Sequence, residues 1–497
     1  MIFEDGTRVS AGTLLARSEE FAAYLSENLR QGSVVAVMGA NRAEFMVAWF
    51  ASVGAGCAVV ALNPQAGSHD LEHVLRDSSA TLAIADSKES QEVLERLSED
   101  LPKLEHVLLM GEGEPDGLTG YETGERLDFR ELDLDPDTIT NIYYTSGTTG
   151  PPKGCMVNHR YWKRLVDSYL EERGLGEDDR ILCCLKFFYN DPSWQLLASL
   201  SAGAPLVIMR KFSVSRFWRV VNDNGVTQLF TIGSIPALLL SAPASPLERQ
   251  HSVRFGVQVA IDAERHREMV ERWGVPWVDS YGLTETGGLV SVPLADAEAM
   301  IGRGTMGRPR KDVEIRLVDE SGADMPAGKP GELLARVPDM MVGYLNRPDA
   351  TKAAIDEENW FHTGDVVRAD EDGWLYFSGR KKDIVRRAGE NISASEVEEV
   401  LRGHPQVIDA AVVPVADELK GEEILAHLYV GEASTEALPE DVAGFCTDKL
   451  ARHKLPRYLI FRHEDFPRTP SMRIAKNKIE HGTVPDGAWD CEQAEVV

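Results

Sequence analysis

Short apolar runs alternate with helical patterns along the first half of this chain, and that alternation restricts the folds it can adopt. Strands separated by helices in this way become parallel neighbours in one sheet. The predicted strands are 33–38, 59–62, 81–84, 140–144, 181–185, 205–209 and 228–232, and the predicted helices are 43–53, 70–76, 161–172, 194–200, 217–222 and 236–240. We therefore predict an α/β protein with a large N-terminal domain of two doubly wound α/β halves.

The pattern changes near residue 302. From about 302 to 379, short alternating strands at 313–318, 331–337 and 374–377 are separated by Gly, Pro and Asp turns, which favours a small β-barrel or sandwich. Beyond 383, helices at 394–402 and 438–450 accompany strands at 407–414, 423–430 and 458–462. We predict an N-terminal domain at 1–379, a boundary at 380–383, a smaller α+β C-terminal domain at 384–487 and an acidic tail at 488–497, for which we expect disorder.

Composition excludes several kinds of function. The chain has 52 Lys and Arg against 80 Asp and Glu, a formal net charge of −28, which argues against a nucleic-acid partner because such proteins need a basic face. Six cysteines in 497 residues are too sparse for a disulfide framework. The N-terminus has no secretory signal pattern, and the uncharged run 226–247 is interrupted by one glycine and three prolines. We predict a cytoplasmic protein without a membrane span.

A loop rich in Gly, Ser and Thr follows the predicted strand 140–144 and ends in a lysine. Hydroxyls, bare backbone amides and one ammonium group suit an anion such as phosphate. The loop is not a Walker motif, because no Ser or Thr follows the lysine and Pro151-Pro152 prevents a helix from starting there. The candidate phosphate-binding residues are Thr145, Ser146, Gly147, Thr148, Thr149, Gly150 and Lys153.

Further motifs follow the loop in a fixed order. They are Tyr281-Gly282-Leu283-Thr284-Glu285, His362-Thr363-Gly364-Asp365, Gly379-Arg380-Lys381-Lys382-Asp383 and Gly389-Glu390-Asn391-Ile392. With this set and order, the chain resembles the adenylate-forming superfamily of acyl-CoA synthetases, peptide-synthetase adenylation domains and luciferases, from residue 9 to residue 478. The resemblance implies two half-reactions. A carboxylic acid is activated to acyl-AMP by ATP with release of pyrophosphate, and a nucleophile then displaces AMP.

The resemblance also implies roles for matching residues. Thr145 to Lys153 would wrap the β- and γ-phosphates, Thr284 would hydrogen-bond phosphate, and Glu285 would ligate Mg²⁺, which prefers carboxylate oxygen. Tyr281 would stack on adenine. Asp365 would accept hydrogen bonds from both ribose hydroxyls, with Arg380 supporting it. Taken singly, Asp365 could instead be a turn residue, Arg380 half of a surface ion pair and Tyr281 ordinary core.

In this family the C-terminal domain swings between half-reactions, and Lys382 matches the hinge. Gly389 matches a glycine that leaves room for the pantetheine arm of CoA, although a left-handed turn would also need glycine. The chain departs from the family near its end, where Met472-Arg473 replaces a Gly-Lys pair whose lysine contacts the α-phosphate. We predict that Arg473 takes over this catalytic role, with Lys476 as a substitute only if the loop changes register.

The predicted acid pocket includes Tyr189, Asn190, Asp191 and Trp194. The aromatic pattern at 212–218 most resembles the crotonobetaine/carnitine-CoA ligase branch. A carboxylate among aromatic rings suits a substrate ammonium group, so Asp191 could pair with a cationic acid. Alternatively, Asp191 caps the helix that begins at Pro192.

Three functions remain open at this point. The first is an AMP-forming acid-thiol ligase that uses ATP, Mg²⁺ and CoA and acts on a small or medium carboxylic acid. The second is an adenylate-forming enzyme with another acceptor, such as an amine or a carrier-protein thiol, or one that activates nitrite for diazotisation. The third is a nucleotide-binding homologue impaired by Arg473. The oligomeric state also stays open, with a homodimer as one option.

Overall fold

The computed structural model describes residues 1–110, 126–145, 152–233, 235–261, 263–381, 383–388, 390–431, 438–447, 449–468, 474–493 and 495–496. The chain forms two compact units. Unit 1 comprises Met1–Val259, Glu268–Ala299 and Val337–Ile355, and unit 2 comprises Ala260–Arg267, Met300–Arg336 and Asp356–Val497. The predicted hinge at 380–383 therefore falls within unit 2, and its role as a hinge stays a prediction.

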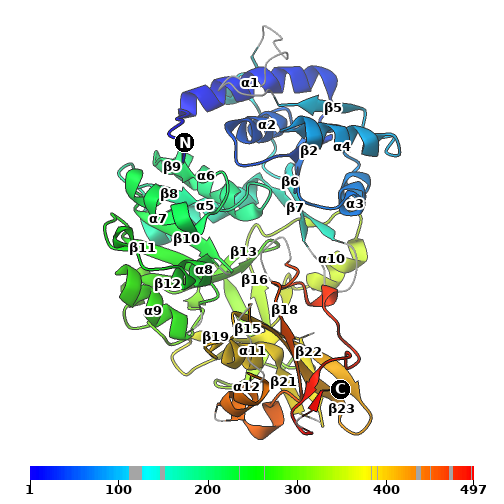
Figure 1. The fold of residues 1–497 in the computed structure, drawn as a ribbon. Helices are drawn as coiled ribbons and strands as arrows, with labels where there is room; N and C mark the ends of the chain where they lie inside the picture. Colours follow the sequence, from blue (N-terminus) through cyan, green and yellow to red (C-terminus); the bar gives the residue numbers. More distant parts are fainter. Residues whose placement is uncertain are drawn as a thin grey trace. The chain divides into compact units, whose positions relative to one another are not determined.

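The first sheet of unit 1 has the strand order β17-β7-β6-β3-β2-β4-β5. Its strands from β6 to β5 pair in parallel, whereas β7 and β17 are antiparallel additions. Helices α1 and α2 lie side by side in Figure 1, and α2 packs next to β2 and β3. The elements are β2 (Val34–Met38), β3 (Ala58–Leu62), β4 (Leu82–Ala85), β5 (His106–Leu109), β6 (Ile139–Thr145), β7 (Lys153–Asn158), β17 (Gly343–Tyr344), α1 (Ala11–Asn28), α2 (Ala43–Gly54), α3 (Ser68–Ser78), α4 (Lys88–Ser98) and the 3₁₀ turn η1 (Phe129–Glu131).

The second sheet runs through unit 1 in the order β1-β9-β8-β10-β11-β12-β13. All neighbours are parallel except β12 and β13, which form a hairpin. Its elements are β1 (Ile2–Phe3), β8 (Ile181–Cys183), β9 (Leu206–Ile208), β10 (Gln228–Ile232), β11 (Phe255–Val259), β12 (Trp277–Leu283), β13 (Gly287–Ser291), α5 (His159–Arg173), α6 (Asn190–Ala202), α7 (Val214–Asp223), α8 (Ile235–Ser241), α9 (Ala263–Trp273), η2 (Pro246–Glu248) and η3 (Leu294–Asp296). Helix α10 (Pro348–Ala354) contacts β17 of the first sheet. The predicted pair of α/β halves is confirmed.

The strands of these sheets are apolar because helices cover both faces, so alternate residues on either face are buried. Val35, Ala36 and Val37 of β2 are fully buried, for example. The uncharged run 226–247 contains β10 and α8, as predicted. Among the described residues, no helix combines the length and hydropathy needed to cross a bilayer.

Unit 2 contains an antiparallel sheet where the sequence predicts a small β-barrel or sandwich. The strand order is β15-β16-β18-β19, and the two outer strands do not pair with each other in the described residues, so the sheet is open. The predicted strands 313–318, 331–337 and 374–377 correspond to three of these four. The strands of this sheet are β15 (Glu314–Val318), β16 (Pro330–Arg336), β18 (Phe361–Ala369) and β19 (Leu375–Arg380), and unit 2 also contains β14 (Arg308–Pro309), which is outside this sheet.

The remaining sheet of unit 2 has the order β21-β20-β23-β24-β25-β26, with β22 paired to β23. Helices α11 and α12 pack with it around a core that includes Val397, Leu428 and Val442. The elements are β20 (Ile384–Arg387), β21 (Glu390–Ser393), β22 (Asp409–Asp417), β23 (Gly421–Tyr429), β24 (Tyr458–Arg462), β25 (Trp489–Asp490), β26 (Glu495–Val496), α11 (Ala394–Arg402), α12 (Leu438–Thr447), η4 (Arg452–Lys454) and η5 (Lys476–Lys478). The predicted α+β pattern is confirmed.

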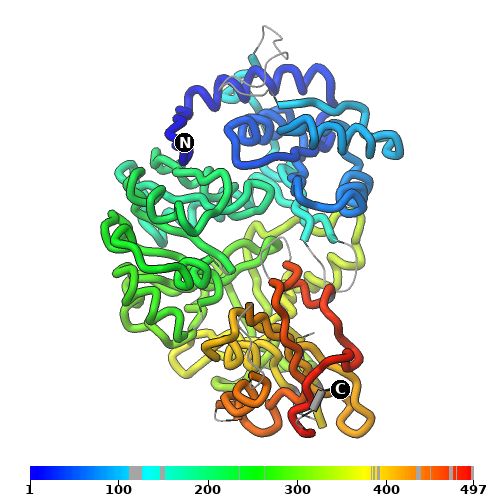
Figure 2. The backbone as a smooth tube through the Cα atoms, viewed as in Figure 1, coloured from blue at the N-terminus to red at the C-terminus, as the bar shows by residue number. Residues whose placement is uncertain are grey.

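The expected disorder of the acidic tail is wrong for its described residues. Strand β25 pairs antiparallel with β24, and Ala488 and Asp490 are buried. Arg457 donates to the Asp490 carboxylate over 3.2 Å, so a cation inside the sheet compensates an acidic residue of the tail. Figure 2 draws this segment in red at the C-terminal end of the chain, where β25 pairs with β24.

Candidate active site

The two ends of the predicted phosphate loop meet in an antiparallel pair of strands. Thr145, the last residue of β6, lies opposite Lys153, the first residue of β7. A side chain at Gly154 would come within 2.8 Å of Ile142, so the residue after the lysine has to be small. The five central candidates, Ser146, Gly147, Thr148, Thr149 and Gly150, lie outside the described residues.

The turn between β12 and β13 contains Thr284 and Glu285, and it places Glu285 beside Thr145 at the start of the loop. Thr145 Oγ1 lies 3.5 Å from Glu285 Oε1, although the two residues are far apart in sequence. Tyr344 donates a hydrogen bond from its hydroxyl to Glu285 Oε1 over 2.9 Å. Met341 N donates to the Glu285 carbonyl over 2.8 Å. The structure thus brings Thr145 and Glu285 together and adds Tyr344, which the sequence analysis missed.

Tyr344 also contacts the lysine of the loop. Lys153 Nζ lies 5.0 Å from the centre of the Tyr344 ring, within range of a cation–π interaction. Burial, followed by the negative charge of Glu285, raises the pKa of Tyr344, so its hydroxyl stays protonated and can donate. Nothing in the local sequence marks this residue, because its partners come from other parts of the chain.

A short hydrogen-bond chain leads from the Thr284 turn to the predicted acid pocket. Tyr161 donates from its hydroxyl to the Thr284 carbonyl over 2.9 Å, and Asn190 Nδ2 donates to the Tyr161 hydroxyl over 2.7 Å. Tyr161 is fully buried. Sequence reasoning missed it as well, since a tyrosine near the start of a helix has no distinctive signal. Tyr281, in β12, is buried at 6% exposure, and its contact with adenine stays a prediction.

Asp191 does not cap its helix, so the capping alternative is wrong. The cap position of α6 is Tyr189, and no side chain caps that end. The Asp191 carboxylate instead accepts from Trp194 Nε1 over 3.3 Å. No Lys, Arg or His side chain pairs with it among the described residues. Burial raises the pKa of Asp191 because no positive charge compensates its ionised form.

Aromatic rings surround this carboxylate. The Trp194 ring lies 4.7 Å from that of Tyr169 and 5.1 Å from that of Phe230, measured between ring centres. Tyr143 hydrogen-bonds Ser193 over 2.9 Å beside it. Asn190 Oδ1 is buried without a hydrogen-bond partner, which is costly unless a ligand or water supplies a donor. The four predicted pocket residues therefore lie together at the start of α6.

Asp365 and Arg380 form a second group, in unit 2. They lie opposite each other in strands β18 and β19, with Arg380 Nε 2.9 Å from Asp365 Oδ1. Asp365 lies inside strand β18, so the turn-residue alternative is wrong. Its side chain is only 1% exposed, and this almost fully buried carboxylate faces the guanidinium. Asp365 N also donates to Thr363 Oγ1 over 3.0 Å within β18.

The remaining predicted residues, Lys382, Gly389 and Arg473, lie outside the described residues. Lys476 is described, and its Nζ lies 2.6 Å from Glu398 Oε1 and 3.8 Å from Asp383 Oδ2. Glu398 is 5% exposed and also accepts from Val412 N. Lys476 is thus the partner of a buried carboxylate, which argues against it as a substitute for Arg473.

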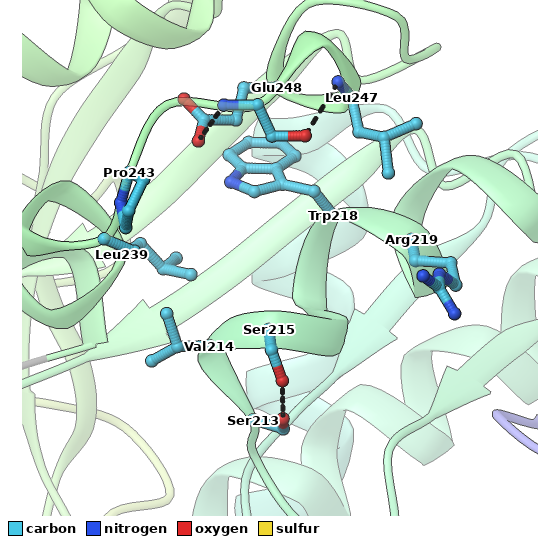
Figure 3. Close-up of a pocket in the computed structure, with 11 residues that line it drawn as sticks. Ser213, Val214, Ser215, Trp218, Arg219, Leu239, Pro243, Leu247 and Glu248 are labelled. Carbon is cyan, nitrogen blue, oxygen red and sulfur yellow. Dashed lines mark hydrogen bonds between the residues drawn. The ribbon is translucent and has the colours of Figure 1, made fainter.

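A separate pocket of unit 1 is lined by none of the predicted residues that the structure describes (Figure 3). Its volume is about 430 Å³, and its wall comes from α7, α8 and the segment that ends at Glu248. Arg272 pairs with Glu248 over 2.7 Å and also donates to the carbonyl of Ala242. The Glu248 carboxylate in the wall is thus paired, whereas Trp218 Nε1 is buried without a hydrogen-bond partner, and the described residues predicted for ATP and the acid lie elsewhere.

Comparison with protein families gives two matches. The profile of AMP-binding enzymes matches residues 1–345, and the profile of the AMP-binding enzyme C-terminal domain matches residues 396–473. Among curated proteins, the chain is 30% identical over 470 residues to crotonobetaine/carnitine–CoA ligase of Citrobacter koseri. This alignment covers 92% of this chain and 90% of the relative.

Two solved structures of o-succinylbenzoate CoA synthetase from Bacillus subtilis are similar along nearly the whole chain. The complex with the acyl-adenylate intermediate is 27% identical, with a TM-score of 0.84, and the match covers 97% of this chain and 96% of the relative. The complex with ATP and magnesium ion is also 27% identical, with a TM-score of 0.82, and the match covers 96% and 95% of the two chains.

Proposed function

Since this chain belongs to the family of AMP-binding enzymes, we propose that it activates a small or medium carboxylic acid with ATP and transfers the acyl group to CoA. The observation that carries this proposal is the convergence of Thr145, Lys153 and Glu285 around Tyr344 in unit 1. A carboxylate beside both ends of a phosphate loop is what a metal-bound triphosphate requires.

The reaction balances in two steps. A carboxylate oxygen of the acid attacks the α-phosphorus of ATP, and the bond to pyrophosphate breaks, leaving acyl-AMP. The CoA sulfur then attacks the acyl carbon, the bond to AMP breaks, and the thiol proton passes to solvent. Positioning and charge stabilisation supply most of the rate enhancement in phosphoryl and nucleotidyl transfer. The acyl-adenylate seen with a relative of 27% identity supports this order of steps.

Glu285 is the residue we assign to Mg²⁺. Its Oε1 is oriented by Tyr344, and its Oε2 has no hydrogen-bond partner among the described residues, so a hard oxygen is available to the ion. When bound, the ion would neutralise phosphate charge. Lys153 and the loop would bind the β- and γ-phosphates, Thr284 would donate to phosphate, and Tyr281 would contact adenine. We assign the ribose to Asp365 and Arg380 and CoA to the Gly389 loop.

For the acid we propose a cationic group, recognised by Asp191. An uncompensated carboxylate among aromatic side chains favours an ammonium ligand, which restores its charge balance and contacts the rings. The similarity to a crotonobetaine/carnitine–CoA ligase supports this assignment, since both acids named there carry trimethylammonium groups.

A screen of acids with AMP release as the readout tests the function. We expect release to require ATP and one class of acid, and we expect the acyl-CoA mass to appear only when CoA is present. AMP release that does not depend on CoA and increases when an amine is added would instead identify the amine as the acceptor. Bound ATP with background pyrophosphate exchange for every acid would identify an impaired homologue.

Asp191→Asn tests the acid class. We expect the preference for γ-trimethylammonio-butanoate over its isostere with a quaternary carbon in place of nitrogen to fall about tenfold or more, because the asparagine is neutral. The ratio of kcat/KM values for the two acids measures this. Asp137→Asn, at an exposed ion pair with Arg160, is the matched control and should leave the ratio unchanged. An unchanged ratio in Asp191→Asn would show that Asp191 does not recognise the ammonium group of the acid.

The same carboxylate predicts a pH dependence. Burial raises the pKa of Asp191, so it is protonated over part of the range where an exposed carboxyl is already ionised. The KM of the ammonium acid should therefore fall as pH rises through this pKa and then level off. The KM of the neutral isostere should stay flat over that range. Parallel pH profiles for the two acids would contradict the assignment.

A further inference from the structure

Tyr344 touches both charged residues that we assign to the triphosphate. Its hydroxyl donates to Glu285 Oε1 over 2.9 Å, and its ring lies 5.0 Å below Lys153 Nζ. The side chain is almost buried, with 9% of the residue exposed. One aromatic residue therefore connects the proposed metal ligand to the proposed phosphate-binding lysine.

The local fold holds Tyr344 in one place. Its amide donates to Thr351 Oγ1 over 2.9 Å, and the Thr351 hydroxyl donates to the Arg347 carbonyl at the start of α10. On the other side, Tyr344 pairs with Cys155 in β7, two residues after Lys153. Gly343 has φ +153° and an added Cβ there would come within 3.0 Å of Thr351, so the strand and helix α10 approach closely at this point.

This placement has a consequence for Glu285. A carboxylate on a turn can rotate, and each rotation presents different lone pairs to a metal ion. The Tyr344 hydrogen bond occupies Oε1 and so fixes the plane of the carboxylate, leaving Oε2 as the oxygen without a partner among the described residues. A carboxylate already fixed in position loses less entropy when it binds an ion.

We infer that Tyr344 is a positioning residue for the metal–triphosphate site. Its hydroxyl orients Glu285 toward the ion, and its ring holds the Lys153 ammonium at the end of the phosphate loop. The inference rests on the proposed function, because it takes Glu285 as the metal ligand. It adds a residue that touches neither metal nor nucleotide and acts through the two that do.

Tyr344→Phe separates the two effects, because it removes the hydroxyl and keeps the ring. The probe is Mn²⁺ with α,β-methylene-ATP, followed by electron paramagnetic resonance without turnover. We expect Mn²⁺ to bind the variant complex about tenfold more weakly, the range of a lost hydrogen bond to a charged group. Binding of AMP without metal should stay as in the unchanged protein. Equal Mn²⁺ affinity in the two proteins would overturn the inference.

Tyr376→Phe is the matched control. Tyr376 also donates to a carboxylate, Asp370 Oδ2, over 3.0 Å, but at a turn of unit 2. Its loss should leave Mn²⁺ affinity unchanged. If both variants weaken Mn²⁺ binding equally, the effect is not specific to Glu285 and the inference fails.

Tyr344→Leu tests the ring. It should lower the affinity for metal-free ATP about threefold relative to Tyr344→Phe, because the cation–π contact with Lys153 is lost. Equal ATP affinity in the Phe and Leu variants would show that the Tyr344 ring does not hold Lys153 for ATP binding. Thermal melting of both variants checks that the fold, including the antiparallel pairing of β7 with β17, is retained.

Glu285→Gln separates failure of this inference from failure of the proposed function. If Glu285→Gln weakens Mn²⁺ binding and Tyr344→Phe does not, Glu285 is a ligand that needs no positioning, and only the inference is wrong. If Glu285→Gln leaves Mn²⁺ binding intact, the metal assignment itself is wrong.

Discussion

Asp365→Asn is expected to lower kcat/KM for ATP in the adenylation step about 100-fold. The Asp365 carboxylate is buried opposite Arg380, where we propose that it accepts from two ribose hydroxyls. Asparagine keeps one acceptor oxygen and turns an NH₂ group toward the ribose or toward the guanidinium. Two hydrogen bonds to a charged acceptor are worth about 3 kcal/mol, which corresponds to about 100-fold in rate. Pyrophosphate exchange at varied ATP measures it.

Deoxy-ATP provides a second test of the proposed contact between Asp365 and the ribose. The unchanged enzyme should prefer ATP over deoxy-ATP, because deoxy-ATP has lost one of the two hydroxyls. The preference should shrink in Asp365→Asn, where the acceptor is already impaired. A variant with lower activity but an unchanged preference would show that Asp365 acts on the fold and not on the ribose.

Asp370→Asn is the control from the same β-hairpin. Asp370 accepts from the amides of Asp372 and Trp374 in the turn between β18 and β19. Hydrogen bonds and the Arg368 charge outweigh burial and lower the pKa of Asp370, so the ionised form is the one that stabilises this turn. Its asparagine variant should melt at a lower temperature while keeping the preference for ATP over deoxy-ATP.

The fold was largely predictable because its central strands are buried on both faces. Such strands appear in a sequence as apolar runs, and β2, β3 and β10 were all found in this way. Helix α4 was missed, because Ser90 and Leu94 are the buried residues in it and its apolar spacing is weak. Strand β7 was missed for a different reason. Gly154 and Asn158 interrupt its pattern, and its position depends on pairing with β6.

The candidate site was only partly predictable. Motifs identified Thr145, Lys153 and Glu285 as residue types, but Tyr344 lies 59 residues from Glu285 in sequence, and only the fold brings them together. The tail was misjudged because acidity alone does not cause disorder. Trp489 packs against the core of unit 2, and Asp490 finds its counter-charge in Arg457, which belongs to another strand.

Asp191, at the start of α6, is a residue that the sequence analysis selected but whose role it could not decide. Asp191 followed by proline has the composition of a helix cap, and composition could not decide between cap and pocket. The decision came from the position of the helix start, since Asn190 already belongs to α6 and Asp191 turns to Trp194.

Arg473→Ala is expected to have the largest effect, a loss of about 1000-fold in adenylation. A cation placed on the phosphoryl group in the transition state is worth about that much or more in related chemistry. Thioester formation from preformed acyl-AMP should change less than about threefold, because that step breaks the acyl carbon–oxygen bond and leaves every bond to phosphorus intact. The two half-reactions are measured separately, by pyrophosphate exchange and by CoA consumption with synthetic acyl-AMP.

Lys476 is the other cation that could contact the α-phosphate in place of Arg473. Arg468 and Ile474 form a β-bridge on either side of the segment that holds Arg473, and Lys476 pairs with buried Glu398. Glu398 also pairs with Arg402 over 3.2 Å, so to reach a phosphate Lys476 would have to give up its 2.6 Å contact and leave Arg402 as the remaining described cation beside this buried carboxylate. Lys476→Ala should therefore lower the melting temperature and leave the ratio of the two half-reaction rates unchanged.

Arg473→Lys should recover part of the adenylation rate that Arg473→Ala loses. Equal loss of both half-reactions in Arg473→Ala would contradict the assignment, because a residue that acts only on the α-phosphate cannot slow the attack of CoA.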